Sequence, residues 1–239
     1  MNVEITGPRV LGYLFGNPNL PITETMRNAW IVMAFILFLC ILLTHRMQKI
    51  PKGKQALAEK AVIMIENLVD NTMGSGCRAF APYIATLLMS SLFGSLATLF
   101  CMRPVTADLN TTLGWALITF ALITYNKIKY GGFKGYLKSF LEPVFVMAPL
   151  NLLSEIATPV SMSFRHFGNM AGGLVISTLI LGALEVLSNA VLGFLPVPLL
   201  QIGLPGILSL YFDCFTACMQ AFIFSMLTMA YVGDARGSS

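Results

Sequence analysis

Charged side chains are scarce in this sequence. Only 11% of the 239 residues are Asp, Glu, Lys or Arg, whereas 56% are hydrophobic. Such a chain has too little polar surface to face water on all sides, which excludes an ordinary soluble domain and indicates a multi-span membrane protein. The net charge of +4 arises from basic residues grouped beside apolar runs. Grouping of this kind carries topology information, and we expect no nucleic-acid partner.

Metal and redox motifs are lacking as well. The five cysteines are odd in number, show no CxxC spacing, and lie in or beside apolar segments: Cys40, Cys77, Cys101, Cys214 and Cys218. We expect them to be small buried hydrophobic side chains, with no disulfide, metal or cofactor. Residues 1–28 have no basic start followed by a short apolar core, so neither a cleavable signal nor a transit peptide is expected.

Apolar runs divide the chain into segments of a single multi-pass domain over 1–239. After an outer N-terminal segment (1–28) we expect spans at 29–44, 81–102 and 111–126. Between the first two, residues 55–73 carry apolar side chains at helical spacing and charged ones on the other face. This pattern favours a helix in the membrane interface, with a soluble loop helix as the alternative.

The C-terminal half holds two unusually long apolar segments. Val144–Leu195 is too long for one perpendicular crossing of a hydrocarbon core roughly 30 Å thick. Gly206–Val232 would extend about 40 Å as a helix. The turn between them is predicted at Pro196, Pro198, Gly203, Pro205 and Gly206. The predicted fold class is an all-α membrane protein with an N-terminal span, an interfacial helix, a two-helix pair and a strongly tilted helical hairpin at 140–232.

Basic residues also predict orientation. Eleven of the 15 lie in 46–80, 127–138 and at Arg236. By the positive-inside rule these regions face the cytoplasm, with the N-terminus outside and the C-terminus cytoplasmic. A bacterial plasma membrane is favoured over a thylakoid.

Arg165 is the one basic residue inside a long apolar run. A guanidinium stays protonated, and placing it at mid-membrane costs from a few to roughly 10 kcal/mol. Asn169 is four residues on and shares its helical face, and Gly168, Gly172 and Gly173 keep the nearby surface low. Asp213 and Gln220 are seven apart in the second segment. We expect these carboxylate, amide and guanidinium groups to face one another.

Simpler roles stay open for these residues. Arg165 could extend to an interface, and Asp213 could merely neutralise it. Gln220 or Asn169 alone would be ordinary interhelical hydrogen-bonding groups.

Other polar residues have simpler roles too. Asp108 is placed to cap the helix that follows it. Periodicity does not decide the roles of Glu155 and Glu185. His166 lies about 100° around the helix from Arg165, so packing or a lipid-facing position is expected rather than ligation.

Three runs carry a family resemblance: PLNLLSEIATPVSMSFRHFGNM, MQAFIFSMLTMAY and PVTADLNTT. Over nearly the whole chain the sequence resembles subunit a of bacterial-type F-type ATP synthases, the membrane stator beside the rotating c-ring. The resemblance implies c-ring subunits, b-type peripheral stalk subunits and the lipid bilayer as partners, with the hairpin packed on the ring. It also implies transport of protons or sodium ions by two offset half-channels, in a subunit that is not an enzyme by itself.

The resemblance carries over to six positions. It implies that Arg165 is the essential arginine and Gln220 its glutamine partner, which together serve ion translocation. The remaining four correspond to polar or acidic positions of the half-channels: Asn169, Asp213, Asp108 and Glu155.

Three positions depart from the family pattern. Leu174 stands where many bacterial members have glutamate, Asp213 where their partner residue is histidine or glutamate, and His166 where leucine is usual. The outer relay is therefore expected to depend on one carboxylate.

Two functions of other classes remain as alternatives. A secondary transporter would use Arg165 to bind an anionic substrate. A purely structural membrane subunit would tolerate neutral substitutions of Arg165.

Overall fold

The computed structural model describes residues 8–13, 17, 21–45, 47–50, 52–74, 76–100, 102–141, 146, 148–191 and 210–237. The fold is all-α apart from a small antiparallel pair of strands, β1 (Val10–Tyr13) and β2 (Pro21–Thr23), which the sequence did not predict. The strands lead directly into the first helix, α1 (Glu24–Thr44). This helix begins five residues before the expected span because the Thr23 hydroxyl accepts a hydrogen bond from the Met26 N–H, 3.3 Å away.

The next helix, α2 (Lys54–Met73), has two different ends. Its first half exposes Leu57, Val62, Ile63 and Met64. Its last turns bury Val69 and Met73 in the main hydrophobic core, where Met229 and Val232 also lie. Helix α2 is thus anchored at its C-terminal end and leaves an apolar face uncovered over the rest, as an interfacial helix does.

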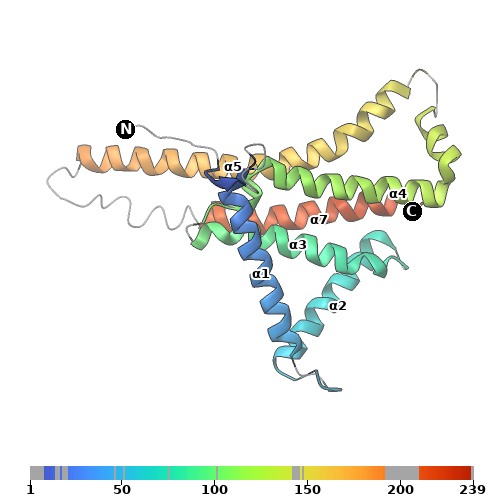
Figure 1. Cartoon of the computed structure of the whole chain (residues 1–239), viewed down its shortest axis with the longest axis horizontal. Helices are drawn as coiled ribbons and strands as arrows, with labels where there is room; N and C mark the ends of the chain where they lie inside the picture. Colours follow the sequence, from blue (N-terminus) through green and yellow to red (C-terminus); the bar gives the residue numbers. More distant parts are fainter. Residues whose placement is uncertain are drawn as a thin grey trace.

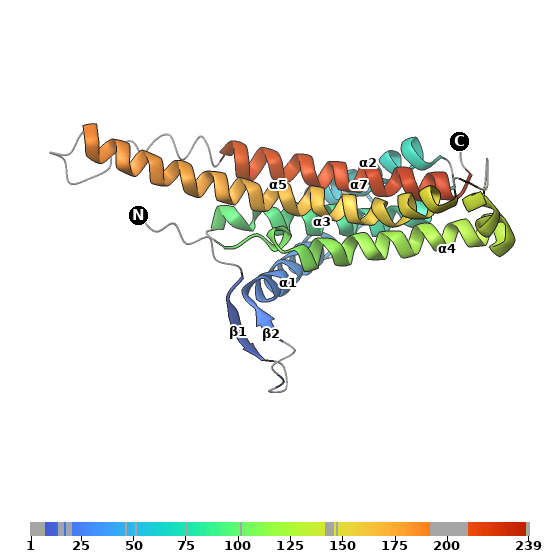
Figure 2. The ribbon, with the colours of Figure 1, turned by 90° about the horizontal axis from the view of Figure 1, so that it is seen from above.

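Four helices lie side by side in one bundle: α3 (Ala81–Leu96), α4 (Leu109–Leu141), α5 (Ala148–Val191) and α7 (Thr216–Ala235). Figures 1 and 2 show them running in roughly one direction, with α1 leaving the bundle at a steep angle. If α1 crosses the membrane near its normal, α5 and α7 must be strongly tilted.

Four described helices are long and apolar enough to cross a membrane: Glu24–Thr44, Arg78–Phe100, Ala148–Ser188 and Asp213–Ala235. Helix α4, which contains the expected span 111–126, is not among them because threonine, asparagine and lysine interrupt its apolar run. Thr112 and Thr119 are fully buried, so neighbouring helices rather than lipid cover this side of α4.

Helix α4 also extends well beyond residue 126. Gly132 has a positive φ of 70°, a conformation that glycine adopts without steric cost, and the helix bends there. After the bend, the last part of α4 turns towards the start of α5, at the right of Figure 1.

The predicted turn of the C-terminal hairpin, from Pro196 to Gly206, lies outside the described residues. The expectation of buried cysteines was wrong in part: Cys77 is buried, whereas Cys40 and Cys218 are exposed. Lipid can cover such thiols as well as a protein core can.

Candidate functional site

Helix α5 has one face inside the bundle and one outside. Met162, His166 and Met170 recur every four residues and are buried, whereas Arg165 and Asn169 are exposed. This alternation follows from the helical repeat of 3.6 residues. The sequence predicts that Arg165 and Asn169 share one face, and the structure shows that this face points away from the bundle.

The surface around Arg165 is low and open. A Cβ added at Gly168, Gly172 or Gly173 would meet nothing within 4 Å. Among the described residues, none forms a hydrogen bond or an ion pair with the Arg165 side chain. The guanidinium thus projects from the bundle over a smooth helix face that another helix could approach closely.

Helix α7 does not bring its polar groups to Arg165 in the expected way. Gln220 is only 7% exposed and lies between the buried Ala217 and Ala221. Asp213 is half-buried in a π-helical turn, η6 (Leu210–Phe215), that precedes α7. Within the described part of the chain, no hydrogen bond joins Arg165 to Gln220 or Asp213. The wide turn changes the rotational phase of the helix, so a seven-residue spacing no longer guarantees a shared face.

His166 lies inside the bundle and not against lipid. Its Nε2 is 3.1 Å from the Ser91 hydroxyl of α3. Its ring packs beside Trp115 of α4 and Phe224 of α7, with centroid distances of 6.2 and 5.4 Å. The neighbour of Arg165 therefore contacts three helices and fixes the rotation of α5, which keeps Arg165 pointing outward.

Further buried hydroxyl pairs run through the same interior. Thr112 and Ser163 are 3.1 Å apart, and Ser95 and Thr106 are 2.8 Å apart. Sequence reasoning missed these pairs. The only signal was the abundance of Ser and Thr within apolar runs, which does not reveal partners.

Asp108 caps α4, as expected. Its Oδ1 accepts a hydrogen bond from the Asn110 N–H at 3.0 Å. Its Oδ2 accepts a second one, at 2.6 Å, from the hydroxyl of Thr25 at the start of α1. Thr25 also lies 2.9 Å from the Thr23 hydroxyl, so a short row of oxygen atoms leads from Asp108 towards the N-terminal strands.

Glu155 lies at the other end of the bundle, in an ion pair. Lys127 Nζ is 2.8 and 2.9 Å from its two carboxylate oxygens, and the Tyr136 hydroxyl is 3.5 Å from one of them. Burial raises the pKa of Tyr136, and the negative charge of Glu155 adds to this effect.

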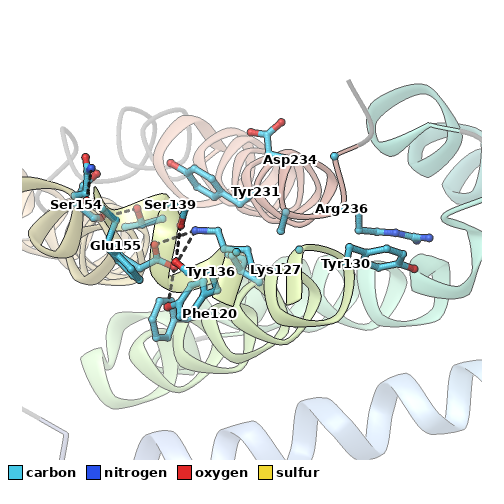
Figure 3. A pocket seen from close by; sticks show the side chains of 18 residues that line it. Phe120, Lys127, Tyr130, Tyr136, Ser139, Ser154, Glu155, Tyr231, Asp234 and Arg236 are labelled. Carbon is cyan, nitrogen blue, oxygen red and sulfur yellow. Dashed lines mark hydrogen bonds and ion pairs between the residues drawn. The ribbon is translucent and has the colours of Figure 1, made fainter. Parts of the chain in front are cut away.

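These residues line a cavity of about 670 Å³ between α4, α5 and the end of α7. Figure 3 shows Lys127 and Glu155 pointing into it, with Tyr231 and Arg236 on the α7 side. The space is large enough for several waters. It opens at the end of the bundle that carries the basic residues of α4.

The structure thus places the six expected residues in four regions. Arg165 and Asn169 share an open outer face, Glu155 lies in the cavity, and Asp108 lies at the junction of α1 and α4. Gln220 and Asp213 lie on α7 and the turn before it. Among the described residues, no group of three or more His, Cys, Asp or Glu side chains could hold a metal ion.

Known proteins resemble this chain over most of its length. The sequence model of the family ATP synthase A chain matches residues 26–233. A protein of Propionigenium modestum described as ATP synthase subunit a, sodium ion specific, is 32% identical over 92% of this chain and 76% of its own length. ATP synthase subunit a 2 of Bradyrhizobium sp. is 30% identical over 98% of this chain and 97% of its own. Subunit a of Moorella thermoacetica is 31% identical, with 90% and 91% covered. The all-α architecture and the four described helices that are long and apolar enough to cross a membrane agree with these matches, and the chain belongs to the ATP synthase A chain family.

Proposed function

We propose that this chain is the stator subunit a of the F0 sector of an ATP synthase, in which Arg165 couples ion flow across the membrane to rotation of a c-ring. The observation that supports this role is a permanent cation on an open, glycine-lined outer face of α5, with no partner among the described residues. Family membership favours this role over an independent transporter.

An exposed guanidinium in lipid needs an anionic partner from another chain. At an effective dielectric constant near 20, a carboxylate 4 Å away interacts with it by about 4 kcal/mol. A cation at this distance also lowers the pKa of a carboxyl group by roughly 1 to 3 units. A rotor carboxyl is neutral while it faces lipid, and it ionises when it arrives opposite Arg165. The glycines beside Arg165 let the rotor helix come this close.

The fixed charge also separates two access routes. Glu155 precedes Arg165 by ten residues, or about 15 Å along a helix. We propose that the cavity at Glu155 is part of the cytoplasmic half-channel. Asn169, on the far side of Arg165, then belongs to the outer half-channel. An ion cannot pass Arg165 directly and must travel around with the ring, so a membrane voltage produces torque.

The outer route depends on Asp213 because Leu174 replaces a second carboxylate. Asp213 lies in a π-helical turn, a feature that is frequent at functional sites. Gln220 follows Asp213 by seven residues, and we propose that it acts with Arg165 in ion translocation when the ring is present. Asp108, with its row of threonine hydroxyls, contributes to the outer end.

Orientation completes the proposal. The positive-inside rule supports a cytoplasmic cavity end and an outer β1–β2 end in a bacterial plasma membrane. The ring consists of c-subunits, and b-type stalk subunits hold the stator. The transported ion is a proton or a sodium ion, and the Propionigenium modestum relative is named as sodium ion specific.

The test is ion-driven ATP synthesis by the whole complex in sealed vesicles. Arg165→Ala should abolish synthesis driven by an imposed ion gradient while the complex still assembles. Arg165→Lys should fail or nearly fail, because a lysine lacks the planar fork and can lose its proton on burial. Arg27→Ala removes a guanidinium from the exposed start of α1 and should have little effect. Gradient-driven synthesis by the Arg165→Ala complex would refute the role.

A further inference from the structure

The part of α4 beyond Gly132 carries apolar side chains that the protein leaves uncovered. Phe133, Leu137 and Leu141 are spaced four apart, and 64%, 52% and 42% of their surfaces are exposed. Four residues make about one helical turn, so the three form a single stripe. The stripe spans residues 133–141, which form the end of α4 after the bend at Gly132.

The edge of this segment directly beside the stripe packs on α5. Tyr136 and Phe140 are half-buried, and the Tyr136 hydroxyl lies 3.5 Å from a carboxylate oxygen of Glu155 in α5. The Phe140 carbonyl oxygen accepts a hydrogen bond of 3.0 Å from the Asn151 side chain of α5. These contacts hold the segment in a fixed orientation, so the exposed stripe is a defined surface and not a loose tail.

Lysines border the stripe on one side. Lys134 and Lys138 each follow a stripe residue by one position, which places them about 100° around the helix, and both are exposed. Before the bend, the Lys129 Nζ lies 5.7 and 5.8 Å from the ring centres of Tyr125 and Tyr130. Exposed tyrosines and lysines beside apolar side chains are typical of the headgroup layer of a membrane.

We propose that residues 133–141 form an anchor on the surface of an anionic leaflet. Phe133, Leu137 and Leu141 enter the boundary between headgroups and acyl chains. Lys134 and Lys138 bind the phosphates of anionic phospholipids such as phosphatidylglycerol. The bend at Gly132 sets the direction of this segment relative to the rest of α4. This surface is separate from the face of Arg165, so its role does not depend on ion transport.

The first experiment measures lipid contact in the full-length chain in nanodiscs. Leu137→Trp adds a fluorophore to the stripe, and the emission of the unmodified chain is subtracted. Brominated phosphatidylcholine and brominated phosphatidylglycerol, at equal mole fraction, are the quenchers. We expect quenching by both, with a local enrichment of phosphatidylglycerol of about fivefold for each lysine at low salt.

Charge variants test the lysines. Lys134→Gln with Lys138→Gln should bring the ratio of quenching by the two lipids close to one. The matched pair Lys49→Gln with Lys52→Gln removes the same charge from exposed positions before α2 and should leave the ratio unchanged. The proposal would be overturned if both pairs of substitutions changed the quenching ratio equally. It would also be overturned if the ratio were already near one in the Leu137→Trp chain that keeps all its lysines.

The second experiment uses the assembled complex in cells. A benzoylphenylalanine photo-crosslinker in place of Leu137 should form no adduct with another protein. A specific protein adduct would show that a neighbouring subunit covers the stripe. Absence of quenching by either lipid in nanodiscs would show that the stripe does not contact the membrane. Either result would overturn the lipid proposal.

Discussion

Variants of the ion pair between Lys127 and Glu155 can distinguish a role of Glu155 in protein stability from a role in ion transport. Its Nζ–Oε1 distance is 2.8 Å, and the two side chains are 35% and 13% exposed. Breaking a fully buried pair costs about 3 to 5 kcal/mol, whereas an exposed pair contributes about 0 to 1 kcal/mol. For this partly buried pair we expect either single variant, Lys127→Met or Glu155→Gln, to lower the free energy of unfolding by about 2 kcal/mol.

The double variant distinguishes the two roles. Lys127→Met with Glu155→Gln leaves no unpaired charge, so stability should return to within about 1 kcal/mol of the parent. Unfolding of the detergent-solubilised chain by a denaturing detergent measures this recovery. If Glu155 belongs to the cytoplasmic half-channel, passive ion conductance after removal of the catalytic head should stay low in the double variant. Conductance that recovers together with stability would refute the half-channel role and leave Glu155 as a structural residue.

Three further predictions concern the bundle interior and the outer end. Ser91→Ala and His166→Leu each remove the same hydrogen bond, so a double-mutant cycle should show a coupling of about 1 kcal/mol in the free energy of unfolding. Additive effects of the two substitutions would contradict the contact. Thr25→Val should destabilise the chain by about 2 kcal/mol in the same assay, since the Asp108 carboxylate loses a charge-assisted bond, and an unchanged midpoint would contradict this. Asp213→Asn should slow ion uptake from the outside while Arg165 still couples transport to rotation; unchanged passive conductance would count against its relay role.

The sequence was most informative about which residues share a helix face, because the helical repeat alone decides this. Because Arg165 and Asn169 are four apart, their shared face followed from periodicity, and the burial of Met162 and Met170 confirms it. The fold class followed from apolar runs and their lengths. The cap at Asp108 followed from a residue type at a helix start.

Contacts between helices could not be predicted from local sequence patterns in the same way. The pairing of His166 with Ser91 depends on how α3 and α5 pack, which no local pattern encodes. The π-helical turn at Asp213 changes a rotational phase that was calculated for an ideal helix. The bend at Gly132 had a visible signal in the two adjacent glycines, but glycine alone does not say which way the chain turns.

The central claim is that the Arg165 face lies against a rotating ring. Disulfide cross-linking between α5 and the ring tests this proximity most directly. Gly168→Cys, in a complex without other cysteines, would be paired with a cysteine beside the mid-membrane carboxyl of the ring subunit. The account predicts a disulfide between stator and ring that blocks rotation, and none from Met170→Cys on the inner face of α5. Failure of Gly168→Cys to reach the ring, together with its ready labelling by a reagent confined to the headgroup layer, would contradict the account.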